Sequence, residues 1–145
     1  MFEKLFLLVK NNAGTAVMNN PEIPEKDRES VINEASSSII EVLKGQMESG
    51  RMKDLVKFFQ FPEIYHGALI TSVVNKFANK LNKFYGIGSA SALVTANSLI
   101  PPVMFELTKQ SAEGENKEFA ISSFLSKING NRADLSGLVH QMMAA

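Results

Sequence analysis

The sequence predicts an all-α protein, a single compact orthogonal bundle of six or seven helices over residues 1–145. Three observations lead to this prediction. Apolar side chains recur at three- and four-residue spacings along most of the chain, no segment alternates with period two, and no two-residue hairpin turn joins two apolar runs. A chain of this length can also bury a core of its own, because a domain of about 150 residues buries roughly 68–70% of its unfolded surface.

The N-terminal third is expected to hold two helices and a connector. The first helix is expected over residues 2–19, because Gly14 weakens a helix without ending it. Residues 19–24 are expected to be non-helical, since each proline there disfavours helical dihedrals at the residue before it. Pro24 suits the first position of the second helix, and Gly50 suits its end. The apolar stripe of that helix comprises Val31, Ala35, Ile39, Val42, Leu43 and Met47.

The middle of the chain predicts a short third helix over residues 51–60, ended by Phe61 and Pro62, and a long fourth helix over residues 63–85. The fourth is the clearest helix in the sequence, with an apolar stripe of Ile70, Val73, Val74, Phe77, Leu81 and Phe84. Its opposite face alternates lysine and asparagine. A turn over residues 86–88 closes it, and Ser89 is a candidate N-cap for the fifth helix.

The C-terminal half predicts the remaining helices. Pro101 and Pro102 together remove two backbone donors, so the fifth helix is expected to kink or break there before continuing to residue 110. A polar loop over residues 111–116, a sixth helix over residues 117–128 and a short seventh helix from Asp134 complete the chain. The second and fourth helices are expected to be the longest.

Composition excludes several classes of site. The chain has no cysteine, which excludes disulfides, thiolate zinc sites, iron–sulfur ligation and thiol nucleophiles. The apolar run at residues 5–9 is too short for a secretory signal, and no later run approaches the roughly 20 apolar residues of a membrane span. The sequence therefore predicts a cytoplasmic protein without a membrane span.

Two short motifs invite comparison with ligand sites. Glu63 and His66 have the Glu-x-x-His spacing of a di-iron bundle, but the second half-site is missing, because Gly137 stands three residues before the other histidine, His140. The glycines at 86–88 follow a helix rather than a strand and lack the lysine of a phosphate-binding loop. We therefore expect no metal, no cofactor and no catalytic residues.

Lys76, Lys80 and Lys83 are the residues that favour a nucleic-acid surface. They lie on the predicted fourth helix near three aromatic side chains, a combination found in proteins that bind nucleic acid. However, the 15 basic and 15 acidic residues leave a formal net charge of zero, and Phe77 and Phe84 are expected in the core. Three lysines on one helix usually form a solvated face, so nucleic-acid binding is the alternative function and not the favoured one.

Three stretches carry a family resemblance: residues 1–5 leading into the connector at 19–24, the turn at 83–88 followed by an alanine-rich helix ending near Pro101, and the Asn129-Gly130-Asn131 punctuation near the C-terminus. On the strength of these stretches, the chain as a whole resembles an uncharacterised bacterial family related to YidB, domain of unknown function 937. The chain departs from that family by lacking its glycine-rich run near Gly50. The resemblance implies an all-helical fold and supplies no catalytic residues.

The function expected from these observations is that of a non-enzymatic interaction or scaffolding domain, acting through an exposed helix face. Its partner is expected to be a protein, either a second copy or a different chain. An enzyme ranks last, because no convergent set of titratable residues is evident in the sequence.

Overall fold

The computed structural model describes residues 2–62 and 67–112, and within these ranges every regular element is a helix. The prediction of an all-α fold is confirmed. The predicted sixth and seventh helices lie outside the described residues. The predicted single domain over residues 1–145 therefore stays a prediction.

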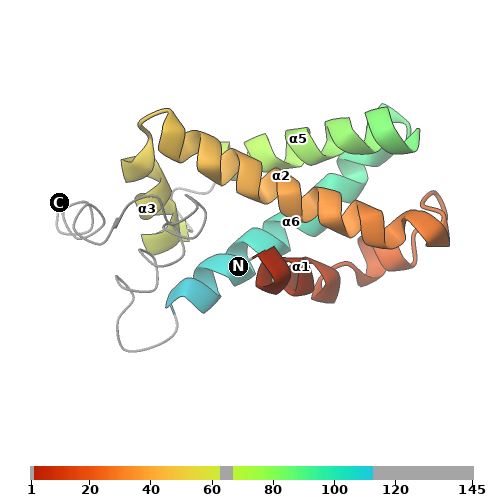
Figure 1. Cartoon of the computed structure of the whole chain (residues 1–145), viewed down its shortest axis with the longest axis horizontal. Coiled ribbons are helices and arrows are strands. Elements are labelled where there is room, and N and C mark those ends of the chain that lie inside the picture. Colours follow the sequence, from red (N-terminus) through yellow and green to blue (C-terminus); the bar gives the residue numbers. More distant parts are fainter. Residues whose placement is uncertain (1, 63–66, 113–145) are drawn as a thin grey trace.

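Two long helices, α2 (Arg28–Glu48) and α6 (Ser89–Ala112), organise the fold. Three other helices, α1 (Phe2–Asn11), α3 (Met52–Gln60) and α5 (Gly67–Tyr85), each contact both of them. Figure 1 shows α2 and α5 side by side, with α6 crossing behind α2. Helix α1 lies below α2 and next to α6. The buried apolar side chains of all five helices join one hydrophobic core.

The predicted first helix is wrong in its extent, because the α-helix ends at Asn11. Asn12 donates its side-chain amide to the carbonyl of Leu8 at 2.8 Å, and the backbone N–H groups of Asn12 and Ala13 bond three residues back instead of four. Asparagine side chains compete with helical hydrogen bonds in this way. The chain then forms a π-helix, η1 (Gly14–Met18), in which Met18 and Asn19 donate to carbonyls five residues back.

The connector at residues 19–24 is non-helical as predicted, and it is anchored to the bundle. Asn20 accepts a hydrogen bond from the backbone N–H of Glu22 and donates to the Thr95 hydroxyl on α6 at 3.3 Å. Ile23 is 1% exposed and belongs to the core, which the sequence did not predict. Pro24 was predicted as the first residue of the second helix, but it is the N-cap of a 3-10 helix, η2 (Glu25–Asp27), and α2 begins only at Arg28.

Helix α2 matches its predicted pattern. Val31, Ala35, Ile39 and Leu43 are buried, and Val42 and Met47 pack against the core. The helix ends at Glu48, and Gly50, the glycine predicted to stop it, follows the C-cap Ser49 with φ 78°. Around this glycine, Arg51 donates to the carbonyl of Gln46 at 2.8 Å and Gly50 donates to that of Met47 at 3.4 Å. This pair of bonds is the Schellman motif, which satisfies the last carbonyls of a helix.

We expect Gly50→Ala to lower the free energy of unfolding by about 1–2 kcal/mol, because a Cβ at positive φ approaches the carbonyl oxygen of its own residue. Gly45→Ala is the matched control. Gly45 lies within the same helix, and a Cβ there would meet no atom within 4 Å, so the control should stabilise by about 0.5–1 kcal/mol. Urea unfolding followed by circular dichroism measures both. Equal effects in the two variants would contradict the left-handed cap.

Helices α3 and α5 confirm most of their predicted core. Leu55, Phe58 and Phe59 are buried on α3, and on α5 the buried members of the stripe are Ile70, Val73, Val74, Phe77 and Leu81. The exception is Phe84, which was expected in the core and is 67% exposed. It lies in the last turn of α5, one residue before the helix ends. Phe84 lies on the same side of α5 as the buried stripe, but the core does not extend to the last turn of the helix.

Helix α6 is continuous from Ser89 to Ala112, although Pro101 and Pro102 lie inside it. The predicted break at these prolines is therefore wrong, and the alternative of a kink stays a prediction. At 24 residues α6 is also longer than α2 or α5, so the expectation that the second and fourth helices are longest is wrong. Its first residue is Ser89 itself, and the carbonyl of Gly88 accepts the bond from the N–H of Ala92, which shifts the predicted cap by one residue.

Candidate interaction surface

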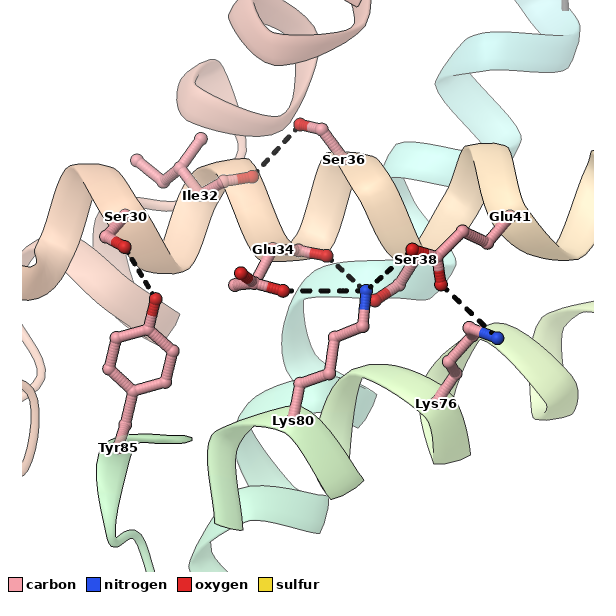
Figure 2. Close-up of polar contacts among 9 residues, drawn as sticks. All are labelled: Ser30, Ile32, Glu34, Ser36, Ser38, Glu41, Lys76, Lys80 and Tyr85. Atoms are coloured by element: carbon pink, nitrogen blue, oxygen red, sulfur yellow. Dashed lines mark hydrogen bonds and ion pairs between the residues drawn. The ribbon is translucent and has the colours of Figure 1, made fainter. Parts of the chain in front are cut away.

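The three lysines predicted to share one outward face are divided by the fold. Lys80 extends toward α2 and lies between two carboxylates, with its Nζ 3.3 Å from Glu41 Oε1 and 3.5 Å from Glu34 Oε2. Lys76 Nζ lies 3.3 Å from the other oxygen of Glu41. Figure 2 shows these four side chains meeting in the space between α2 and α5. The third lysine, Lys83, is exposed and lies outside this cluster.

The same helix pair is joined by a second polar contact. The hydroxyl groups of Ser30 and Tyr85 lie 2.6 Å apart, one turn before Glu34 on α2 (Figure 2). Two further serines of α2 are buried, and each donates to a carbonyl four residues back in its own helix: Ser36 to Ile32 and Ser38 to Glu34. Serine commonly satisfies its hydroxyl in this way, so these residues add small buried side chains without an unsatisfied polar atom.

The two lysines stabilise the charged form of the Glu41 carboxyl group. Burial alone raises the pKa of its carboxyl group, but hydrogen bonds from Lys76 and Lys80 and their positive charges outweigh that effect and hold the pKa below its ordinary value near 4.5. The folded state therefore favours the charged carboxylate. The resulting stability is present above the unfolded-state pKa and is lost as the pH falls through the lower, folded-state pKa.

We expect Glu41→Gln to destabilise the protein at pH 7 by less than about 1 kcal/mol, because the Glu41 side chain is 46% exposed and water screens its ion pairs. Glu25→Gln removes an equal charge at an exposed site on η2 and is the control. Urea unfolding at neutral pH, and again well below pH 4, measures the difference between the variants. A difference that persists at the lower pH would contradict an ionic origin.

A sequence signal for this arrangement does exist. Glu34 and Glu41 are seven residues apart, which places them two turns apart on one face of α2, and Lys76 and Lys80 are one turn apart on α5. The spacing within each helix does not reveal which helices lie together, so the complementary pair of faces was not predicted.

Helix α6 presents the most distinctive exposed surface of the described residues. We define the α6 face as the exposed residues from Ala90 to Pro102, which are Ala90, Leu93, Val94, Asn97, Ser98 and Pro102. Val94 is 66% exposed and Leu93 is 42% exposed. No charged residue occurs from Ser89 to Phe105. The face is thus an uncharged and partly apolar strip on a helix whose other side forms the core.

The sequence did not predict this surface, because a stretch without charged residues does not show which of its sides is buried. By length and composition the stretch from Ser89 to Lys109 is apolar enough to cross a membrane, and 44% of its apolar window is buried inside the structure. The core helix of a soluble protein meets the same criterion, so this observation does not establish a membrane span. It does show that much of an apolar helix lies outside the core.

The described residues were also compared with two other kinds of site, a surface depression and a metal site. An open depression of about 400 Å³ lies between the end of α2, α3 and the start of α5, lined by Gln46, Arg51, Asp54, Leu55, Gly67, Ala68, Leu69 and Ser72. Within the described ranges no three His, Asp or Glu side chains form a group that could hold a metal ion. Glu63 and His66, which have the di-iron spacing, lie outside these ranges, as does His140.

Comparison with known proteins adds no further assignment: no family model matches the chain, and no curated protein or solved structure matches it at a significant level. The resemblance to the YidB-related family therefore stays a prediction. The class that the described residues define is an all-α helical bundle in which one helix, α6, has an uncharged and partly exposed stretch.

Proposed function

We propose that this protein is a non-enzymatic interaction module that binds a protein partner through the α6 face. The observation that carries the proposal is the exposure of Val94 and Leu93 on a helix without charged residues before Glu106. A contiguous exposed apolar surface favours an interaction site, because covering it removes apolar area from water. Cytoplasmic location and membership of the YidB-related family belong to the same proposal.

The chemistry of the α6 face favours a protein partner. Asn97 and Ser98 are polar but uncharged, and the Ser98 hydroxyl already donates to the carbonyl of Val94 at 2.9 Å. A partner that covers the face therefore has no charge to desolvate. The small side chains of Ala90 and Ser98 also allow a helix to approach closely, since the distance between packed helices depends on the side chains at the contact.

The alternative of nucleic-acid binding through the lysines has less support. Lys76 and Lys80 are paired with the carboxylates of Glu34 and Glu41, which neutralise much of the positive charge that a phosphate backbone would require. Lys83 alone supplies a small electrostatic contribution. The ion pairs therefore weigh against this alternative.

The proposal is tested by cross-linked capture from cells that express the tagged protein, with the wild type and two variants in parallel. The wild type should retain a defined protein partner, and Val94→Lys should lose it, because a lysine would be desolvated in an apolar interface. Leu7→Lys is the matched control, since it adds the same charge at an exposed apolar position on α1. Equal recovery of the partner by wild type and Val94→Lys would overturn the proposal.

A further inference from the structure

We propose that the depression between α2, α3 and α5 binds a small zwitterion, a free α-amino acid with an apolar side chain. This inference goes beyond the proposed function, because none of the residues that line the depression belongs to the α6 face. Three properties of the depression support it: its size and its fixed wall, two opposite charges that line it, and an apolar floor beside them.

The depression lies where the end of α2 and the starts of α3 and α5 meet (Figure 1). Its volume of about 400 Å³ falls within the range of roughly 300–1,000 Å³ that is typical of small-molecule sites. The backbone N–H of Arg51 donates to the carbonyl of Gln46 at 2.8 Å, and the carbonyl of Arg51 accepts from the N–H of Leu55 at 3.2 Å. One wall of the depression is therefore held in place by backbone hydrogen bonds before a ligand binds.

Two opposite charges line the depression, on Arg51 and Asp54. These residues are three positions apart at the start of α3, a spacing that places side chains on the same side of a helix. Neither side chain forms an ion pair or a hydrogen bond with another residue in the part of the chain that the structure describes. Both charged groups are exposed and are therefore available to a ligand.

This pair of charges favours a zwitterion. The planar guanidinium group of Arg51 can donate two parallel hydrogen bonds to a carboxylate, and the carboxylate of Asp54 can accept hydrogen bonds from an ammonium group. Asp54 would repel a simple anion and Arg51 would repel a simple cation, so a ligand that carries both charges is favoured over either. An α-amino acid carries both groups on one carbon atom.

An apolar floor lies beside the charges. Leu55 and Leu69 line the depression and are only 1% and 8% exposed, so they are the part of the core that the depression reaches. An apolar ligand side chain placed against them would lose contact with water, which favours binding. Ser72 donates its hydroxyl to the carbonyl of Ala68 at 2.9 Å, and its oxygen can still accept a hydrogen bond from the ammonium group.

An NMR titration of the purified full chain tests the inference, with L-leucine, L-valine and L-methionine as probes. We expect at least one of them to shift the backbone amide signals of Leu55, Ala68 and Ser72, with a dissociation constant below about 1 mM. The amine and the carboxylic acid that each keep only one charged group of the bound probe should bind at least about tenfold more weakly.

Two variants test the roles of the charges. Arg51→Gln and Asp54→Asn should each raise the dissociation constant of the bound probe at least about tenfold, because each removes the partner of one ligand charge. Lys53→Gln is the matched control, since it removes a charge from an exposed residue of α3 that does not line the depression. It should leave the constant unchanged. Circular dichroism establishes that each variant is folded.

Three outcomes would overturn the inference. The first is that none of the three probes shifts these signals at about ten times the expected dissociation constant. The second is equal binding of the bound probe and of its singly charged analogues. The third is binding that Arg51→Gln and Asp54→Asn leave unchanged, since the ligand would then lie elsewhere. None of these outcomes affects the proposed function, whose test uses Val94.

Discussion

Phe77→Ala is expected to lower the free energy of unfolding by about 3–5 kcal/mol, because it removes a large aromatic side chain from a closely packed core and leaves a cavity. Phe77 is 0% exposed and lies midway along α5, which packs against both α2 and α6. Such a loss is a large part of the roughly 5–15 kcal/mol that stabilises a typical domain. Chemical unfolding monitored by circular dichroism measures it.

The matched control for this prediction is Phe84→Ala. The two phenylalanines lie on one predicted stripe, seven residues apart on the same helix, but Phe84 is 67% exposed. Its replacement should change the stability by no more than about 0.5 kcal/mol, as is usual for surface positions. Similar losses at the two positions would show that the core continues to the end of α5.

Ile23→Ala is the second substitution with a large expected effect, about 2–5 kcal/mol, the range for deleting a buried isoleucine side chain. Ile23 lies in the non-helical connector between two prolines, and its carbonyl accepts a hydrogen bond from Arg28 Nε at 3.3 Å. Losing its side chain should loosen the connector from the bundle as well as create a cavity.

Ile23→Val provides the control, because it keeps the shape of the side chain and removes one methylene. It should cost about 0.5–1.5 kcal/mol. Thermal unfolding of both variants beside the wild type gives the comparison. If Ile23→Ala were no more harmful than Ile23→Val, the connector would not contribute to the core.

The sequence predicted those features of the fold that depend on neighbouring residues within one helix. The buried stripe of α2 and the glycine cap at Gly50 follow from local spacing and backbone preference, and both are confirmed. Features that depend on packing against other segments of the chain were harder to predict. Phe84 lies on the correct side of α5 but beyond the end of the core, and Ile23 is buried without belonging to any periodic segment.

Two predicted helix ends were wrong in opposite directions: α1 ends earlier than predicted, and α6 continues past the predicted break. At Asn12 a side-chain amide competes for the carbonyl of Leu8 and ends α1 early, which helix periodicity does not report. At Pro101 and Pro102 two backbone donors are missing, but the helix continues through both residues. Burial of Leu99, Ile100, Val103 and Met104 on both sides of the prolines helps to hold this stretch helical.

The candidate site was predicted less well than the fold. Lys76 and Lys80 were expected on an open face. Instead they form ion pairs with carboxylates of α2, a helix that lies much earlier in the chain. The α6 face was not predicted because its helix has no charged residue from Ser89 to Phe105 to mark the exposed side. In both cases the missing information was which residues of distant segments lie together.

The hydrogen bond between Tyr85 and Ser30 gives this protein an internal optical reporter. The chain has no tryptophan and two tyrosines, so tyrosine dominates its near-ultraviolet emission. The hydroxyl of Tyr85 is held 2.6 Å from that of Ser30, across the contact between α5 and α2. Separation of these helices would break this hydrogen bond and change the fluorescence of the phenol. Ser30→Ala, which removes the bond without touching the fluorophore, isolates the part of the signal that reports on this contact.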